Sequence, residues 1–160
     1  KAGVDAIHPG YGFLSENAQF AEVVRKCGLG FIGPSPEAMA LWGDKLKARE
    51  AAKKFGLPLL PGSDALENAE HAVKEANRVG YPVMIKAAGG GGGRGIRVCE
   101  DEEGLREDFS VAKMESRASF GNDEVYIEKV IVEPRHIEFQ VLADASGHVA
   151  HLGERGDSLA

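Results

Sequence analysis

The sequence predicts a mixed α/β and α+β protein made of three successive pieces. Strand-like and helix-like segments alternate over residues 1–43, which is typical of the end of a doubly wound α/β unit. Residues 60–132 follow the order helix, strand, glycine loop, strand, helix, strand, which predicts a compact α+β module. From His136 onward apolar and polar residues alternate, as in a half-buried strand. We therefore expect one central module between parts of two other domains.

The composition is that of a globular protein, with 43% hydrophobic and 28% charged residues among 160. A formal net charge of −6 argues against a nucleic-acid partner held by bulk electrostatics. No apolar run approaches the roughly 20 residues that span a bilayer, so no membrane partner is expected. Cys27 and Cys99 lack metal-ligand spacing, which favours a reducing compartment. Because the chain starts without Met and stops after a strand-like run, we interpret it as an internal fragment of a longer protein.

Residues 1–59 are expected to contain two short strands and three helices. The strands are expected at Val4–His8 and Phe31–Gly33, and the helices at Glu16–Lys26, directly after Ser35, and at Lys45–Phe55. Ser15, Ser35 and Asp44 are suitable N-caps, because a short side-chain oxygen can accept from the free N–H groups of a first turn. The third helix carries five basic residues, most of which are interpreted as a solvated face: Lys45, Lys47, Arg49, Lys53 and Lys54.

The central module is expected to start with a capping box and a helix. Asp64-x-x-Glu67 fits the box, and Gly80 with Pro82 would stop the helix. The next strand should place Val83, Ile85 and Ala87 on one side and Met84 and Lys86 on the other. The glycine loop, the strand Ile96–Cys99, a helix from Asp101 to Phe120 and the strand Val125–Val132 should follow.

The stretch from Gly89 to Gly93 is the strongest functional signal. Consecutive glycines allow backbone N–H groups to crowd around an anion, and Lys86, Arg94 and Arg97 add positive charge on both sides. This pattern favours a loop over a polyphosphate, although a flexible linker or hairpin tip remains the alternative. It does not fit a P-loop, because Ile96 follows Gly95 where that motif needs Lys-Ser/Thr. It does not fit the dinucleotide-binding glycine loop either, because that loop opens a helix and this one opens the strand Ile96–Cys99.

With these pieces in order, the chain resembles the biotin carboxylase family of the ATP-grasp superfamily. The resemblance covers essentially the whole chain. It rests on six segments in family order, namely His8–Asn17, Phe31–Pro34, Gly43–Lys45, Pro61–Ser63, Lys86 with the glycine loop, and Pro134–Asp144.

The resemblance implies an arrangement of domains. Residues 1–43 would be the C-terminal part of the N-terminal domain, and residues 44–59 a connecting helix. Residues 60–130 would be the ATP-grasp lid, and residues 131–160 the start of the carboxy-terminal ATP-grasp sheet.

The resemblance also implies a reaction. Members of the family use ATP, Mg²⁺ (or Mn²⁺) and bicarbonate to form carboxyphosphate and then carboxylate biotin on a carrier domain. The parent protein would be a ligase, the biotin carboxylase subunit or domain of acetyl-CoA carboxylase or a related carboxylase. It would be a homo-oligomer working with a carboxyltransferase, in the cytoplasm or, in a eukaryote, the mitochondrial matrix.

Site residues follow from the resemblance position by position. Lys45 and Lys86 match two lysines that contact the nucleotide phosphates, and Gly92 and Gly93 match the part of the loop that closes on them. The hinge strand that reads adenine matches Glu128, Lys129, Val130 and Ile131. His136 matches a contact near the ribose. The catalytic and metal-binding residues of the family lie beyond residue 160, so this fragment is expected to be inactive alone.

The sequence departs from the family at its end, where Gly156, Asp157 and Ala160 replace expected residues and Ala160 stands in place of a nucleotide-contacting Gln. Two other functions remain open, and these departures support only the second of them. One is another ATP-grasp ligase, of the carbamoyl-phosphate-synthetase type, against which the His8–Asn17 segment argues. The other is a non-catalytic nucleotide-binding module, against which the retention of Lys45, Lys86 and the glycine loop argues.

Overall fold

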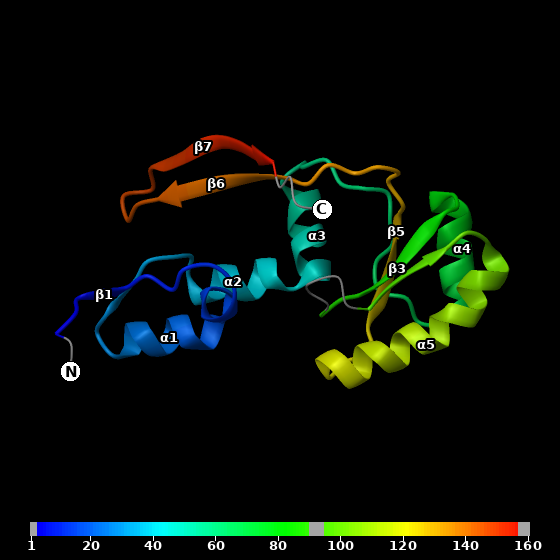
Figure 1. The fold of residues 1–160 in the computed structure, drawn as a ribbon, viewed down its shortest axis with the longest axis horizontal. Helices are drawn as coiled ribbons and strands as arrows, with labels where there is room; N and C mark the ends of the chain where they lie inside the picture. Colours follow the sequence, from blue (N-terminus) through cyan, green and yellow to red (C-terminus); the bar gives the residue numbers. More distant parts are fainter. Residues whose placement is uncertain (1–2, 90–94, 157–160) are drawn as a thin grey trace. The chain divides into compact units, whose positions relative to one another are not determined.

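The computed structural model describes residues 3–89 and 95–156, which form two compact units, Lys1–Val130 and Ile131–Ala160 (Figure 1). The first unit begins with a parallel pair of short strands, β1 (Ala6–Ile7) and β2 (Gly30–Phe31), joined through helix α1 (Ala18–Lys26). Helix α2 (Pro36–Gly43) follows and packs against α1. A parallel pair with a helical crossover is the arrangement expected for the end of a doubly wound unit. Its small core contains Ala21, Val24, Phe31 and Met39.

The start of α1 differs from the prediction. Residues Phe13–Glu16 form a short 3₁₀ helix, and α1 begins after Asn17, whose Oδ1 accepts from the N–H of Phe20 at 2.8 Å. Ser15 does not cap α1, because its hydroxyl donates instead to the carbonyl of Gly12 at 2.8 Å. The predicted caps of the next two helices, Ser35 and Asp44, are confirmed by their hydrogen bonds to first-turn N–H groups.

Helix α3 (Lys45–Lys54) leads into an extended segment rather than a capping box. Helix α4 (Ala69–Val79) is capped by Asn68, so the predicted box at Asp64 and Glu67 is wrong. Backbone hydrogen bonds instead hold the preceding residues along a strand, from Ser63 N to Ile127 O and from Leu66 N to Val125 O, each at 2.9 Å. Pairing with a strand keeps these residues extended, and the helix starts only where the pairing ends.

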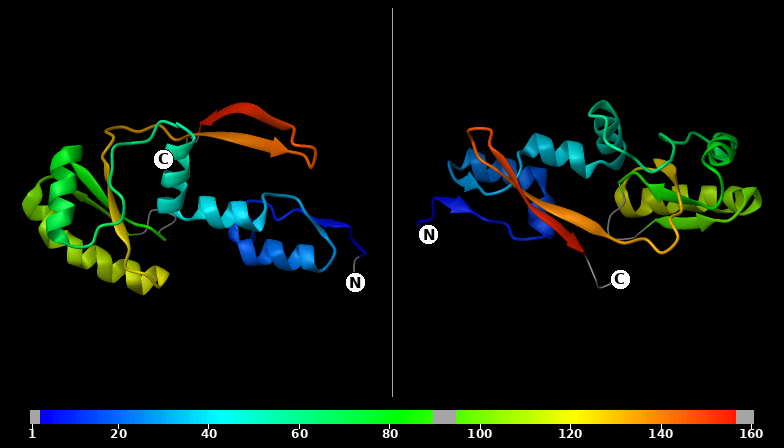
Figure 2. Two further views of the ribbon diagram at one scale, coloured as in Figure 1. Left: turned by 180° about the vertical axis from the view of Figure 1, so that it is seen from behind. Right: turned by 90° about the horizontal axis from the view of Figure 1, so that it is seen from above.

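A three-stranded antiparallel sheet follows, in the order β4 (Ile96–Cys99), β3 (Val83–Ala87), β5 (Val125–Lys129). Helices α4 and α5 (Glu102–Phe120) lie on one side of it (Figures 1 and 2). The main core lies between these helices and the sheet and contains Leu66, Ala72, Val73, Ala76, Val83, Ile85, Cys99, Leu105, Phe109, Ala112, Val125 and Ile127.

Strand β5 is shorter than predicted. It ends at Lys129 instead of Val132. The N–H of Val130 still donates to Pro82 O at 3.2 Å, but Pro82 has no N–H with which to continue the ladder. The start and end of α5 agree with the prediction, with Asp101 as the N-cap and Gly121 in the left-handed region at φ 78°.

The second unit is an antiparallel hairpin of β6 (Ile137–Ala143) and β7 (Val149–Gly156). Asp144 closes its turn, because its Oδ1 accepts from the N–H groups of Ser146 and His148 at 2.8 and 2.9 Å. The predicted strict alternation is broken by a register irregularity between Phe139 and Val141. Within the described residues of both units, no helix is long and apolar enough to cross a membrane.

Candidate functional site

The sheet of the first unit has two chemically different faces, as the alternation in β3 predicts. Val83, Ile85 and Ala87 are buried beneath α4 and α5, whereas Met84 and Lys86 point to the other face. Residues paired across an antiparallel sheet lie on the same face. The strand register therefore defines a second face, called the charged face below, which consists of Met84, Lys86, Ile96, Val98, Tyr126 and Glu128.

Glu128 is the centre of the charged face. Its Oε2 accepts from the ammonium of Lys86, and its Oε1 lies 2.7 Å from Nη1 of Arg49. The side chains of Glu128 and Arg49 are only 10% and 11% exposed, and that of Lys86 is 19% exposed. A buried carboxylate is tolerated only when its charge is compensated, and here each oxygen has its own cation.

Arg49 reaches this cluster from α3, outside the sheet. Its Nη2 donates to the carbonyl of Leu60 at 3.1 Å, and its guanidinium lies 5.8 Å from the centre of the Tyr126 ring. Arg49 is therefore an exception to the solvated face that was predicted for most of the basic residues of this helix. One signal could have found it, since Arg49 is the single arginine among the lysines of α3 and a planar guanidinium suits a buried carboxylate better than an ammonium does.

Lys45 lies close to the same cluster, but its ammonium is not in an ion pair with any described carboxylate. Burial lowers the pKa of its ammonium, the nearby Lys86 lowers it further, and Glu128 opposes both effects. Within residues 3–89 and 95–156 the Lys45 ammonium has no carboxylate in ion-pair distance. Two lysines that repel each other on a partly buried surface favour the binding of an anion between them.

The four predicted hinge residues use their polar groups in different ways. Lys129 donates from its N–H to Pro61 O at 2.8 Å and from its ammonium to Gly80 O and Tyr81 O at 2.9 and 2.8 Å. The N–H of Val130 is also used within the unit. Neither N–H is therefore free for a base, and the side chain of Glu128 is held by its two cations. Ile131 is the first residue of the second unit.

His136 also belongs to the second unit, just before β6. Its Nε2 lies 3.8 Å from Oε2 of Glu138, whose Oε1 accepts from Arg155 at 2.6 Å. All three side chains are well exposed on the hairpin. The structure thus gives Glu138, which the sequence left without a role, an ion pair with the neighbouring strand.

The centre of the glycine loop, including Gly92, Gly93 and Arg94, lies outside the described residues, as do Asp157 and Ala160 at the end of the chain. The residue after the loop, Gly95, has φ 70°, and a Cβ there would lie 3.2 Å from Cβ of Ala87. The sequence predicted that Arg97 adds positive charge beside the loop. In the structure Asp108 and Glu115 bind its guanidinium at 2.7 and 2.6 Å and neutralise that charge.

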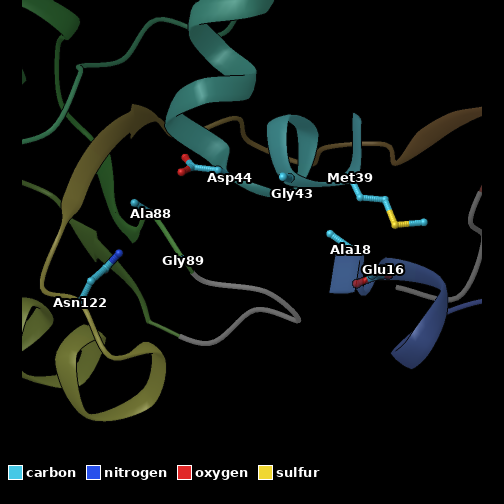
Figure 3. A pocket seen from close by; sticks show the side chains of 9 residues that line it. Glu16, Ala18, Met39, Gly43, Asp44, Ala88, Gly89 and Asn122 are labelled. Carbon is cyan, nitrogen blue, oxygen red and sulfur yellow. The ribbon is translucent and has the colours of Figure 1, made fainter. Parts of the chain in front are cut away.

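A cavity of about 350 Å³ lies beside Ala88 and Gly89, at the start of this loop segment, and next to α2 (Figure 3). Two of its lining residues are close in sequence to the lysines of the cluster. Asp44 directly precedes Lys45, and Ala88 follows Lys86 by two residues. Its lining consists of Glu16, Ala18, Met39, Ala40, Gly43, Asp44, Ala88, Gly89 and Asn122. In the part of the chain that the structure describes, no three His, Cys, Asp or Glu side chains are placed to hold a metal ion.

Comparisons with known proteins agree with this architecture. Residues 1–39 match the family "Biotin carboxylase, N-terminal domain", and residues 44–160 match "Carbamoyl-phosphate synthase L chain, ATP binding domain". A relative from Populus trichocarpa, "Biotin carboxylase 1, chloroplastic", is 54% identical over 96% of this chain and 29% of its own length.

Two solved structures are also similar. The biotin carboxylase domain dimer of the 2-oxoglutarate carboxylase from Hydrogenobacter thermophilus, in complex with MgADP, ADP and bicarbonate, has a TM-score of 0.89 and 48% identity. That match covers 99% of this chain and 35% of the solved one. A biotin carboxylase complex with β-γ-ATP from Campylobacter jejuni has a TM-score of 0.88 and 53% identity, over 95% of this chain and 34% of the other.

The fold and the matched ATP-binding domain define an ATP-grasp protein. With a biotin carboxylase N-terminal domain in front of that domain, and with relatives of this identity, the chain belongs to the biotin carboxylase family. It spans about a third of the length of the relatives and solved chains that it matches.

Proposed function

We propose that these residues form the lid and its flanks in the ATP site of a biotin carboxylase. The full-length protein would use ATP and bicarbonate to make carboxyphosphate and then carboxylate carrier-bound biotin. The observation that carries the proposal is a cluster of three cations around one carboxylate, in which Lys86 stands three residues before the glycine-rich loop. The cluster consists of Lys45, Arg49, Lys86 and Glu128. The similar solved domains that bind ADP, bicarbonate and an ATP analogue support it.

Lys45 and Lys86 would bind the nucleotide phosphates. Phosphoryl transfer depends on positioning and on neutralising negative charge, which two ammonium groups on one partly buried surface can supply. An anion between them would also remove the repulsion that lowers the pKa of Lys45. Gly92 and Gly93 are assigned to the same phosphates by their place in the family motif.

The base and ribose would be bound farther along the chain. Glu128, Lys129, Val130 and Ile131 form the proposed adenine hinge, with carbonyl groups rather than the N–H groups of Lys129 and Val130 as contacts. The exposed apolar side chains of Ile96 and Val98 on the charged face are suited to pack against a flat base. His136 is assigned to the ribose.

The proposed division of labour follows the order of the domains. Residues 1–43 would end the N-terminal domain, residues 44–59 would carry Lys45 to the site, residues 60–130 would be the lid, and residues 131–160 would start the carboxy-terminal sheet. Bound Mg²⁺ (or Mn²⁺) would neutralise phosphate charge, with the ligands that the family resemblance places beyond residue 160. The further partners would be a biotin carrier domain, a carboxyltransferase and a second copy of the protein, as the dimer of the Hydrogenobacter domain suggests.

A second candidate is an ATP-grasp ligase of the carbamoyl-phosphate-synthase type. The name of the family that matches residues 44–160 favours it. The match of residues 1–39 to a biotin carboxylase N-terminal domain argues against it, because that segment is independent of the ATP-binding part.

ATP hydrolysis by the full-length protein separates the two candidates. We expect phosphate release in the presence of Mg²⁺ to require bicarbonate and to increase with free biotin. A Lys86→Met variant is the control for contaminating ATPases and should reduce that release at least tenfold, about 1.4 kcal/mol. Hydrolysis that is indifferent to biotin would support the second candidate. Nucleotide binding without hydrolysis would contradict both.

A further inference from the structure

Arg49 has a role that is separate from phosphate binding by Lys45 and Lys86. On the basis of the proposed function, we infer that Arg49 is a positioning residue, which keeps the Glu128 carboxylate neutralised and in place when Lys86 turns from Glu128 to a nucleotide phosphate. Arg49 itself would not touch the nucleotide. Its effect on binding would pass through Glu128.

The first step of the argument is the sharing of Glu128 between two cations. Lys86 binds one carboxylate oxygen and Arg49 binds the other, so the two contacts are independent. A lysine ammonium is a compact charge on a flexible stem, and it can leave Glu128 without disturbing the guanidinium. When it does so, Arg49 remains the one cation paired with Glu128 among the described residues.

The second step is the burial of the carboxylate. Glu128 is 8% exposed, so water reaches it poorly. A buried charge that loses its last partner is strongly destabilised, because the desolvation cost is then uncompensated. Without Arg49, Lys86 would therefore be held on Glu128, and a phosphate would have to compete with that contact.

The third step is the way in which Arg49 is fixed. Its Nη2 donates to Leu60 O, and its guanidinium lies against the Tyr126 ring. Gly62 leaves room for this placement, since a Cβ there would lie 2.9 Å from Nη2 of Arg49 and 2.5 Å from Ile127 O. These contacts hold the guanidinium without any help from Lys86.

A purely structural Arg49, which only links α3 to the sheet, would make the same contacts as an Arg49 that positions Glu128. Nucleotide titrations of the full-length protein distinguish these two roles. We expect Arg49→Met to weaken MgADP binding at least tenfold, about 1.4 kcal/mol, while adenosine binding changes less than threefold. Phosphate is present in only one of these ligands, and Lys86 responds only to phosphate. Arg49→Lys, which keeps a cation near Glu128, should recover part of the loss.

Lys53→Met is the matched control. Lys53 lies on the same helix, four residues after Arg49, and pairs with Asp64 at 2.9 Å across the same junction. That pair is exposed, so its loss should leave the affinities for both ligands unchanged. Thermal unfolding of each variant would show that the titrations measure folded protein.

A second background tests whether Arg49 acts through Glu128. In a Glu128→Gln protein the carboxylate charge is absent, so adding Arg49→Met should change MgADP affinity less than threefold. Three results would overturn the inference: an unchanged MgADP affinity in Arg49→Met, equal losses for adenosine and MgADP, or a full tenfold loss in the Glu128→Gln background. Wild-type protein that does not bind MgADP would instead refute the proposed function itself.

Discussion

The two faces of the β4–β3–β5 sheet are made from alternate residues of the same strands, yet one face forms the apolar core and the other carries the charged cluster. Ile85 points beneath α4 and α5 and is completely buried among apolar side chains. Its neighbour Lys86 points to the charged face and binds Glu128. The covered face supplies stability without specific chemistry. The charged face carries Lys86 and Glu128, beside Lys45 and Arg49 of α3, and these charged groups contribute little to the apolar core.

The difference shows how one small module can be both stable and responsive to a ligand. Burying apolar side chains stabilises the fold in proportion to the area removed from water and depends little on the ligand. Charges on a partly buried face are destabilised by desolvation, and their attraction to a ligand of opposite charge can offset this cost. Mutations on the two faces should therefore separate unfolding free energy from nucleotide affinity.

The largest effect is expected on the covered face. Ile85→Ala should lower the free energy of unfolding by about 2–5 kcal/mol, because it leaves a cavity in a close-packed core. Ile96→Ala, on the charged face and 39% exposed, is the matched control and should cost much less. Denaturant unfolding of the full-length protein measures both changes. The comparison fails if the two variants lose equal stability.

An intermediate effect is expected at Gly62, beside the charged face. Gly62→Ala would place a Cβ 2.5 Å from Ile127 O and 3.2 Å from Cγ of Glu128. We expect about 1–3 kcal/mol of lost stability from the forced backbone shift, together with weaker MgADP binding. Gly104→Ala, where the nearest atom is Asp101 Oδ1 at 3.5 Å, serves as the tolerant control. Lost stability with unchanged affinity would separate Gly62 from the charged face.

The smallest effect, of opposite sign, is expected at Lys45. Its pKa is lowered by burial and by Lys86, so its charged form is unfavourable in the ligand-free protein. Lys45→Met should therefore raise the unfolding free energy without nucleotide by about 0.5 kcal/mol, as is common when a functional residue is removed. The same variant should weaken MgADP binding. A loss of ligand-free stability would show that Lys45 is a structural residue.

Local rules predicted most of the central module. Features that depend only on neighbouring residues are confirmed. They are the alternation in β3, the extent of α5 and the caps at Ser35, Asp44 and Asp101. The start of α4 was missed because residues 61–67 pair with β5, which is about 60 residues away in sequence. The start of α1 was missed because the Ser15 hydroxyl is used within the preceding turn.

The site was predicted less completely than the fold. The sequence singled out Lys45, Lys86 and Glu128, and the structure brings them together. It could not reveal that Arg49 shares Glu128 with Lys86, since that contact joins residues 79 positions apart. It also assigned free charge to Arg97, whose acidic partners lie on the following helix and are not visible from local spacing.

The most direct test of the account is the MgADP affinity of the full-length protein with and without the Lys86 charge. Calorimetric titration should show at least tenfold weaker binding to Lys86→Met than to the wild type, a difference of about 1.4 kcal/mol. Lys113→Met, which removes a cation on α5 that pairs with Asp123 at 3.4 Å, should bind like the wild type. Equal affinity of the Lys86→Met and wild-type proteins would contradict the assignment of the charged face to the nucleotide phosphates.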